Sequence, residues 1–153
     1  MVKKSLHNSN DFNEIVARIS LLSENSHRKW GRMNVAQMLT HCELILKVPL
    51  KKVHLSKPNF IFRGIGILTK KEIQIFNNGI PHNMPSFQKL IVNFECDFEV
   101  AKNNLLNTLN EYVKAYENQD LPNDHALFGT MKEKDWGFME YKHLNHHLKQ
   151  FNV

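Results

Sequence analysis

The apolar residues between positions 93 and 118 recur at the spacing of an α-helix, and this pattern constrains the fold more than any other feature. They form one stripe along the segment: Phe94, Phe98, Ala101, Leu105, Leu109, Tyr112 and Tyr116. Because an α-helix turns by about 100° per residue, these side chains share one face, which must be buried against neighbouring elements. The segment therefore predicts a long helix from about Asn93 to Asn118.

Three further segments show the same kind of pattern. Residues 11–24 repeat apolar side chains at helical spacing. Residues 34–48 open with an Asn-x-x-Gln capping pattern and are followed by Pro49, which is typical of the end of a helix. The last segment opens with a capping box, Thr130 and Glu133, and runs nearly to the C-terminus. Together with the long helix, these segments predict an all-α fold, a four-helix bundle.

Length and composition set the limits of this fold. A chain of 153 residues that is 42% hydrophobic corresponds to about one domain, so we expect residues 1–153 to fold as a single unit. The two cysteines, Cys42 and Cys96, lie in apolar periodic segments, which is typical of buried thiols in a reducing compartment. No stretch of 18 or more apolar residues occurs, and the N-terminal lysines are not followed by an apolar run. We therefore expect a cytoplasmic protein with no membrane partner.

The charge of the chain bears on its partners. A formal net charge of +5 permits contact with anions. However, no nucleic-acid recognition motif occurs, and the aromatic residues lie on the core stripes instead of among the basic residues. We therefore expect a small-molecule partner and no nucleic acid, while a homodimer stays open.

A long connector, residues 47–90, separates the second and third predicted helices. It holds most of the proline and glycine of the chain, and residues 58–71 have the character of a short extra helix. A structureless loop of this length is uncommon in a compact domain, so we expect it to cover a functional site. Residues 47–71 contain seven Lys or Arg and no acidic residue. Two interpretations follow, a solvated connector and a basic wall that attracts anions to the site.

A cluster of histidines lies near the C-terminus, in the stretch EYKHLNHHLKQF. On a helix, His143 and His147 are stacked one turn apart, within a sector of about 80° that also contains Trp136, Glu140 and Phe151. This side of the helix should face the core. The cluster is interrupted and in phase with the core residues, so it is not an expression tag. His146 lies about 100° from His147 around the axis, nearer the rim.

Two buried imidazoles need a partner, because each unpaired polar nitrogen costs about 1–3 kcal/mol. A metal ion supplies one, since a His-x-x-x-His pair on a helix presents two ring nitrogens to a single ion. His41, at the edge of the apolar stripe of the second helix, offers a third ligand. We therefore expect His41, His143 and His147 to hold a divalent metal ion: Zn, Ni or Fe. Three neutral imidazoles leave a coordination position open, as in catalytic sites.

Three neighbouring side chains are candidates for supporting roles. Glu140, one turn before His143, is a candidate general base, outer hydrogen-bond acceptor or extra ligand, or an exposed helix glutamate. Gln37 either presents its amide to the site or caps the second helix. We place His146 at the rim, in contact with substrate or with the metal ligands. Three other histidines lack ligand spacing and are interpreted as surface or loop-packing residues: His54, His82 and His125.

The stretches WGRMNVAQMLTHC and KEKDWGFMEYKHLNHHLKQF resemble the DinB-like superfamily, also called YfiT-like, and within it a branch of unknown function. The resemblance spans nearly the whole chain. It implies a DinB-like four-helix bundle with two long crossing connections and a divalent metal held by three histidines, which fall on His41, His143 and His147. After the paired histidines the family often continues with Arg-Gly-Gln, whereas this chain has Leu148, Lys149 and Gln150.

The same resemblance suggests an activity. Some members of the superfamily transfer low-molecular-weight thiols or isomerise thiol adducts, and others are described as metal-dependent hydrolases. We therefore expect a metal-dependent transferase that uses a low-molecular-weight thiol, or a hydrolase, acting on a small anionic substrate. The alternative is a helical bundle that binds metal without catalysis or has a structural role.

Overall fold

The computed structural model describes residues 3–82 and 84–153, which are mostly helical. The helices are α1 (Ser9–Ser20), α2 (Val35–Leu46), α3 (Phe60–Phe76), α4 (Phe98–Glu117) and α5 (Glu133–Gln150). A 3₁₀ turn, η1 (Gln88–Leu90), precedes α4, and two short antiparallel strands precede α5: β1 (Asp124–His125) and β2 (Gly129–Thr130). The prediction of a mostly helical chain is confirmed. The hairpin and α3 as a full helix were not predicted.

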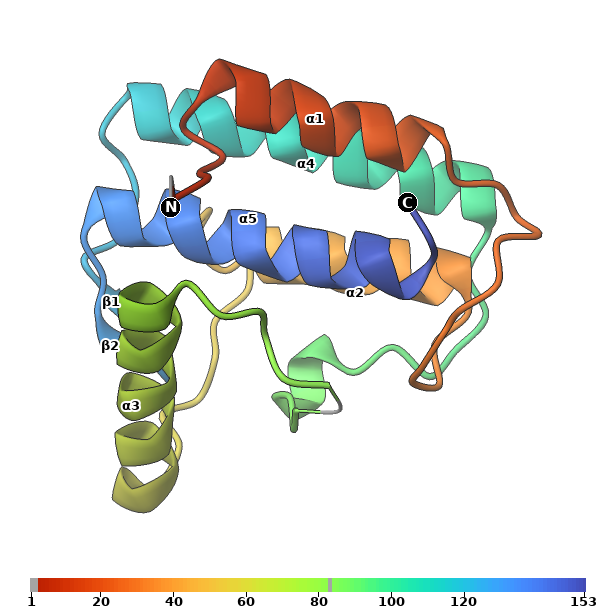
Figure 1. Cartoon of the computed structure of the whole chain (residues 1–153). Coiled ribbons are helices and arrows are strands. Elements are labelled where there is room, and N and C mark those ends of the chain that lie inside the picture. The colour runs from red at the N-terminus through yellow and green to blue at the C-terminus, as the bar shows by residue number, and fades with distance from the viewer. Residues whose placement is uncertain (1–2, 83) are drawn as a thin grey trace.

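Four of the helices surround one core. Helix α5 packs against α1 and α2, and α2 packs against α4, while α3 stands to one side of them (Figure 1). Apolar side chains from all four fill the space between, including Ile15 of α1, Leu39 of α2, Leu109 of α4 and Trp136 of α5. Full burial of one such side chain stabilises the fold by about 1.5–3 kcal/mol. In the described residues, no helix is long and apolar enough to cross a membrane.

The N-terminal caps decide where the helices begin. As predicted, Asn34 caps α2, because its side chain accepts a hydrogen bond from the Gln37 amide and the Gln37 side chain accepts one from the Asn34 amide. The predicted start of the long helix near Asn93 is wrong. Asp97 caps α4 by accepting a hydrogen bond from the Val100 amide, so the helix begins at Phe98, five residues later than predicted, and Phe94 lies outside it with 55% of its surface exposed.

Two other boundaries differ from the prediction. The capping box of Thr130 and Glu133 is wrong, because Thr130 belongs to strand β2 and α5 begins at Glu133. Asp135 supports the start of α5 instead, by accepting a hydrogen bond from the Lys132 amide. Helix α1 begins at Ser9, two residues earlier than predicted, because the Asn8 side chain accepts hydrogen bonds from two amides of its first turn.

The cysteines are free thiols, as predicted. Cys42 is buried in the core and Cys96 is half-buried. Burial raises the pKa of the Cys42 thiol well above its usual range, so this side chain stays protonated and unreactive.

Helix α3 is longer than the short helix expected at residues 58–71. Asn59 caps its start, and Asn77, with a positive φ of 54°, ends it. Polar side chains tie its inner side to the hairpin and to α5: Arg63 donates to the Ala126 carbonyl, Lys70 to the Thr130 carbonyl and Gln74 to the Asp135 carboxylate. Its outer side exposes apolar residues, including Phe60, Ile61, Leu68, Ile75 and Phe76.

Two glycines of α3 offer a matched test of this packing. A Cβ on Gly66 would lie 2.5–2.6 Å from the side chain and carbonyl oxygen of Leu127, whereas a Cβ on Gly64 would meet nothing within 4 Å. We expect Gly66→Ala to lower the free energy of unfolding by about 1–3 kcal/mol. Gly64→Ala should raise it by up to about 1 kcal/mol, because alanine is the better helix former. Urea denaturation of both variants checks this, and equal effects of the two changes would contradict the packing.

Candidate metal centre

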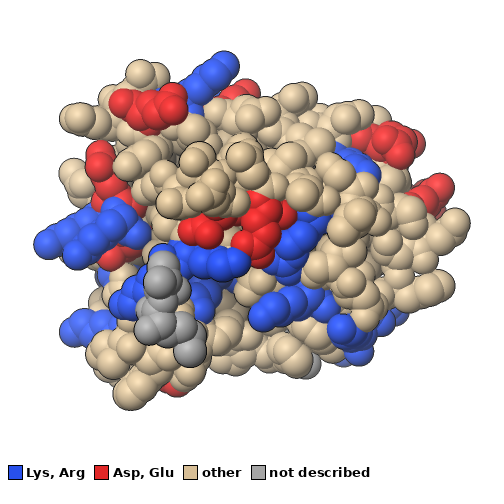
Figure 2. Space-filling view, turned by 45° about the horizontal axis from the view of Figure 1, so that its top comes forward, with Lys and Arg blue, Asp and Glu red and all other residues tan. Residues whose placement is uncertain are grey.

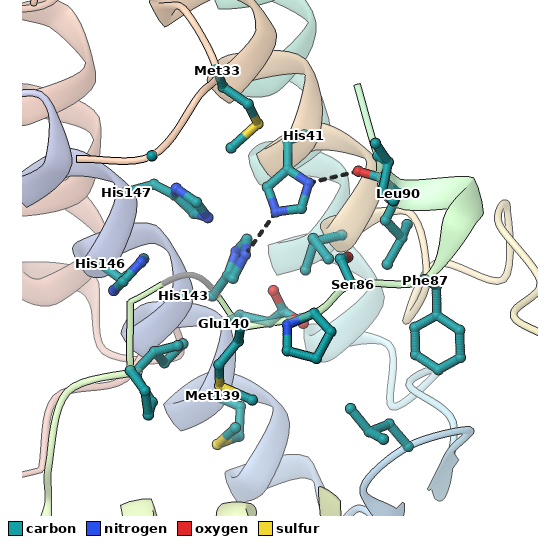
Figure 3. A pocket seen from close by; sticks show the side chains of 18 of the residues that line it. Met33, His41, Ser86, Phe87, Leu90, Met139, Glu140, His143, His146 and His147 are labelled. Atoms are coloured by element: carbon teal, nitrogen blue, oxygen red, sulfur yellow. Dashed lines mark hydrogen bonds between the residues drawn. The ribbon is translucent and has the colours of Figure 1, made fainter. Parts of the chain in front are cut away.

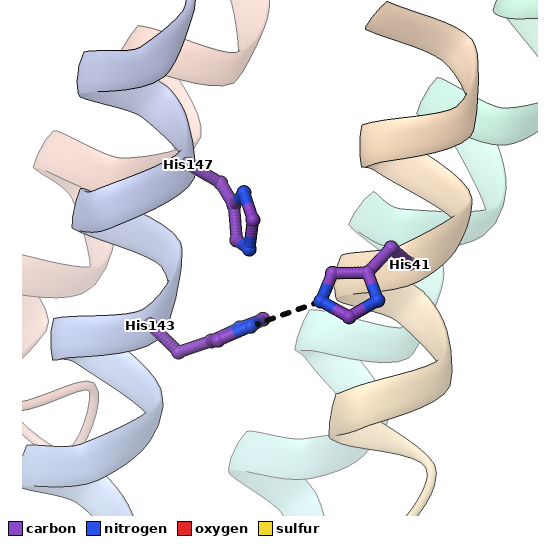
Figure 4. Close-up of side chains that lie close together, drawn as sticks. All are labelled: His41, His143 and His147. Atoms are coloured by element: carbon purple, nitrogen blue, oxygen red, sulfur yellow. Dashed lines mark hydrogen bonds between the residues drawn. The ribbon is translucent and has the colours of Figure 1, made fainter. Parts of the chain in front are cut away.

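Three histidine rings converge between α2 and α5. His143 and His147 come from consecutive turns of α5 and face His41 of α2 (Figure 4). One ring nitrogen from each residue lies within 4.8 Å of the corresponding nitrogens of the other two. The Nε2 atoms of His143 and His41 are 3.3 Å apart. The structure therefore brings together the three histidines that the sequence singled out as ligands.

Hydrogen bonds on the outer side of two rings fix their tautomers. The Nδ1–H of His41 donates to the Leu90 carbonyl oxygen over 2.7 Å. The Nδ1–H of His147 donates to the Gln150 side-chain oxygen over 2.8 Å, and the Gln150 amide nitrogen donates to the Trp30 carbonyl oxygen. Since a neutral imidazole carries one proton, the Nε2 atoms of His41 and His147 keep their lone pairs and face the centre.

The geometry and donor set fit a divalent metal ion. Tetrahedral zinc with Zn–N bonds of about 2.0–2.1 Å places neighbouring nitrogens about 3.3 Å apart. The separation between the Nε2 atoms of His41 and His143 has this value. An outer hydrogen bond to a carbonyl or amide oxygen, as found for His41 and His147, is also the usual support of metal-bound histidines. His41, His143 and His147 are therefore the residues that could hold the ion.

Within residues 3–82 and 84–153, two buried polar atoms at the three rings have no hydrogen-bond partner. They are Nδ1 of His143 and Oε2 of Glu140, which lie one turn apart on α5. Native proteins leave few such atoms unpaired, and those that remain are often found where a ligand, ion or water binds. Glu140 is buried, and this burial raises the pKa of its carboxyl group to about 8.

Burial also keeps the imidazoles neutral. It lowers the pKa of His41, lowers that of His143 well below the usual range, and lowers that of His147 to about 3. Each ring also disfavours a positive charge on its neighbours. Because protons compete with metal ions for ring nitrogens, neutral rings at pH 7 are ready to act as ligands.

The histidines line the inner part of a pocket of about 730 Å³. Figure 3 shows His143 and His147 of α5 on one side of this space and Leu90, Phe87 and Ser86 from the connector on the other, with His41 beside Leu90. As predicted, the connector covers the site. The part of the connector that lines the pocket begins at Thr69 and consists of the last turns of α3 and the segment that follows them, up to Leu90.

The basic residues of the connector lie elsewhere. Four form ion pairs with acidic residues: Lys47 with Glu43, Lys51 with Asp120, Lys52 with Glu111 and Arg63 with Asp124. On the face shown in Figure 2, Lys and Arg side chains likewise lie beside Asp and Glu side chains. Among the described residues that line the pocket, the only Lys or Arg is Arg32, which is exposed. The seven basic residues of the connector, all of them in the described part of the chain, therefore do not line the pocket, and these contacts favour the interpretation of a solvated connector.

The supporting residues are placed as follows. Glu140 lies inside the pocket and is not an exposed helix glutamate. Gln37 lines the pocket, but its amide is paired with the Asn34 amide and the Phe94 carbonyl, so its contacts are those of a cap. His146 is turned toward the rim, where it meets Trp30 and His82 edge to face, and the ring of His82 stacks on Trp30 at 4.0 Å.

Sequence reasoning missed two groups of the site. Gln150 and the Leu90 carbonyl orient the ligand rings. Gln150 follows His147 by three positions, which is the spacing of helix neighbours, so this partner could have been predicted. The Leu90 carbonyl could not, because it reaches the site through the fold of the connector. His82 is exposed and stacks on Trp30, in agreement with the predicted surface or loop-packing role. His125 packs within its own loop, as predicted, by accepting hydrogen bonds from the amides of residues 127 and 128.

Gln150 gives a testable prediction. Replacing it with methionine, which has a similar shape, removes the acceptor that holds the His147 proton on Nδ1. We expect the affinity for Zn²⁺ to fall by about 10–100-fold, the usual effect of losing an outer-sphere partner. Lys149→Met, at the exposed neighbouring position, is the control and should bind as wild type. Competition with a chromophoric chelator measures both, and equal affinity of the two variants would contradict a positioning role.

Comparison with known proteins gives one match. The sequence model of a family described as "Protein of unknown function (DUF1569)" matches residues 1–153. No curated protein and no solved structure matches this chain.

Proposed function

The chain belongs to the DUF1569 family of proteins of unknown function, and we propose that it is a metal-dependent enzyme acting on a small molecule. In this proposal His41, His143 and His147 hold a divalent ion: Zn, Ni or Fe. The reaction is the transfer of a low-molecular-weight thiol or a hydrolysis, and the fold is a DinB-like four-helix bundle. The packing of α1, α2, α4 and α5 around one core is consistent with such a bundle.

One observation carries the proposal. Three neutral imidazoles converge at the inner end of a pocket, where two of them are held by outer hydrogen bonds with their Nε2 lone pairs toward a common point. A structural metal site is usually closed by four protein ligands, whereas a catalytic site has three and an open position. Here that open position would face a pocket large enough for a small substrate.

The ion, Glu140 and the apolar residues of the pocket would each have a different role in such a reaction. When bound, a divalent ion supplies Lewis acidity that lowers the pKa of a thiol or of water to near neutrality. The positive charge of a bound ion would favour the ionised form of Glu140, whose Oε2 is buried without a partner beside the rings, and this carboxylate would then be placed to take up the proton that either nucleophile releases. The apolar walls formed by residues such as Phe87 and Met139 exclude bulk water and hold the substrate. Thiol transfer is slightly favoured over hydrolysis, since both use the same groups and a dry pocket disfavours attack by water.

A second candidate is a protein whose histidines form a hydrogen-bonded core network or bind metal without catalysis. The 3.3 Å contact between His143 and His41 favours it, because one proton shared by the two Nε2 atoms satisfies both in the absence of an ion. The network leaves Oε2 of Glu140 buried without a partner beside the rings, whereas a bound ion would supply a compensating charge there, and this is why we prefer the metal.

Metal content tests the proposal directly. Untagged protein from medium supplemented with Zn, Ni and Fe should contain about one divalent ion per chain by elemental analysis. His147→Ala should lose this ion. His146→Ala should keep it, because its ring packs edge to face against His147, Trp30 and His82 but is not one of the three whose nitrogens converge. Protein without metal under these conditions would leave the core network as the explanation of the cluster.

A further inference from the structure

Helix α3 has its polar side toward its own protein and its apolar side toward the solvent. Arg63, Lys70 and Gln74 donate hydrogen bonds to the β1–β2 hairpin and to α5. The helix stands to one side of the bundle (Figure 1), so another molecule can reach its outer face. On this face, six apolar side chains each have more than half of their surface exposed: Phe60, Ile61, Ile65, Leu68, Ile75 and Phe76.

The outer face of α3 is larger than the apolar patch of a usual monomer. Judged by the exposed fractions of the six side chains, it presents about 800 Å² of apolar surface. The largest patch on a typical monomer is about 300–600 Å², whereas each partner of a stable dimer buries about 800 Å². The face is therefore large enough to be one half of a dimer interface.

The residues along the middle of this face have the spacing of a helix–helix seam. Ile61, Ile65, Leu68, Glu72 and Ile75 are separated by four, three, four and three residues. Residues that repeat in this way form the contact between two helices packed side by side. Because these side chains face the solvent and not the core of their own chain, the partner that the spacing indicates is a helix of another molecule.

We infer that the outer face of α3 is a homodimer interface, in which the α3 helices of two copies of this chain pack in antiparallel orientation. Most oligomers are symmetric dimers, in which the same patch of the two subunits meets itself. The inference concerns the surface of α3 and does not depend on the proposed metal-dependent reaction.

Glu72 decides the orientation of the two helices. A parallel pair would place the two Glu72 carboxylates side by side, and like charges at an interface are costly. In an antiparallel pair with its symmetry axis at Leu68, the middle residue of α3, the two carboxylates are about 12 Å apart along the helices. Each then lies beside Gly64 of the other helix, where the absent side chain leaves room for the carboxylate to reach water.

Glu72 also favours a second copy over a lipid membrane. Helices that lie on membranes keep their charged side chains on the polar face. Glu72 is exposed in the middle of the apolar face of α3, so it would enter the bilayer together with the apolar residues.

The oligomeric state of the full-length, untagged protein tests the inference. In sedimentation velocity between about 2 and 200 µM, the protein should form dimers with a dissociation constant in the micromolar range or below. A monomer at every concentration, or a dimer that Leu68→Glu leaves intact, would overturn the inference.

A matched pair of variants locates the interface. Leu68→Glu places a charge at the symmetry axis and should weaken the dimer by at least about 100-fold. Leu21→Glu is the control, because Leu21 lies at the end of α1 with 72% of its surface exposed, compared with 67% for Leu68. It should dimerise as wild type, and equal weakening by the two changes would contradict the interface. Since both residues are exposed, both variants should keep the wild-type circular dichroism.

Two complementary variants test the orientation. In the antiparallel pair, Ile61 of one helix lies beside Ile75 of the other. Ile61→Glu and Ile75→Lys should each weaken the homodimer, and mixing them should restore dimers through the Glu–Lys contact. A mixture that stays monomeric would contradict the antiparallel pairing.

A flotation experiment separates the dimer from membrane binding. With vesicles of phosphatidylcholine and phosphatidylserine, the wild-type protein should not float with the lipid. A monomeric protein that floats, and that loses this property in Leu68→Glu but not in Leu21→Glu, would assign the outer face of α3 to a membrane and overturn the homodimer.

Discussion

Replacing His143 with alanine is expected to abolish metal-dependent turnover while leaving the helical fold in place. His143 packs against both other rings, with its Nε2 atom 3.3 Å from that of His41 and its ring centroid 4.6 Å from that of His147. Loss of this ligand leaves two nitrogens, and we expect the affinity for the ion to fall by more than about 100-fold. Metal content and turnover should fall together, to the level of buffer.

The fold should survive this change because His143 contributes little to it. Its Nδ1 atom is buried without a partner, so the side chain carries a desolvation cost that alanine does not. Far-UV circular dichroism and urea denaturation check the fold, and His54→Ala, an exposed histidine outside the pocket, is the control. If His143→Ala unfolds the protein while His54→Ala does not, the ion has mainly a structural role.

The type of reaction follows from a substrate panel. Metal-loaded protein is assayed with thiol and electrophile pairs on one side and with activated esters and amides on the other, each in an uncharged and a carboxylate form. Consumption of thiol identifies a transferase, and release of acid from an ester or amide identifies a hydrolase. No turnover in any arm, together with a bound ion, would favour the protein that binds metal without catalysis.

The helices were predictable from the sequence because their apolar residues repeat at helical spacing. Leu105 and Leu109 on α4, for example, lie on the same face of the helix, and this apolar face must be buried. The ends were less predictable, because several residues near each end can act as caps. Asp97 starts α4 although Asn93 also has a capping side chain, and which residue caps depends on the path of the preceding chain.

The connector was the least predictable part of the fold. Residues of α3 divide into an outer apolar side and an inner polar side that bonds to the hairpin. A helix with its polar side inward reverses the usual pattern, so its orientation could not be derived from hydropathy. The seven basic residues of the connector suggested a wall over the site, because the acidic partners of four of them come from distant segments, namely α2, α4 and the residues after α4.

The candidate ligands were predictable because two of them share one helix face. The His-x-x-x-His spacing fixes the relation of His143 to His147, and the apolar stripe of α2 limits where His41 can point. The partners that orient the rings depend on tertiary contacts between distant segments. The Leu90 carbonyl is 49 positions from His41, and no sequence pattern marks a backbone acceptor of this kind.

The pH dependence of stability should reveal the raised pKa of Glu140. The lowered pKa values of buried histidines govern stability below about pH 6.5, and the raised pKa of Glu140 governs it above. Burial raises the pKa of Glu140 from 4.5 to about 8, so between these values the folded protein holds a proton that the unfolded chain has lost. The free energy of unfolding therefore falls as pH rises through this window. Burial lowers the pKa of His147 to about 3 and that of His7 and His125 to about 4, so their contribution is full above about pH 6.5 and is lost in acid. The metal-free protein should be most stable near pH 6–7.

Glu140→Gln should remove the fall in the free energy of unfolding between about pH 6.5 and pH 8. Glutamine resembles the protonated carboxyl group, so the stability of the variant relative to wild type should rise by about 3 kcal/mol between pH 5.5 and pH 8. Urea denaturation of chelator-treated protein between pH 5 and 8.5 measures the difference. Glu133→Gln, an exposed change on the same helix, should follow the wild-type profile throughout. Because the effect needs a carboxyl group that is buried without a partner, parallel profiles for wild type and Glu140→Gln would mean that Glu140 is solvated or paired in solution, and the proton-accepting role proposed for it would lose its basis.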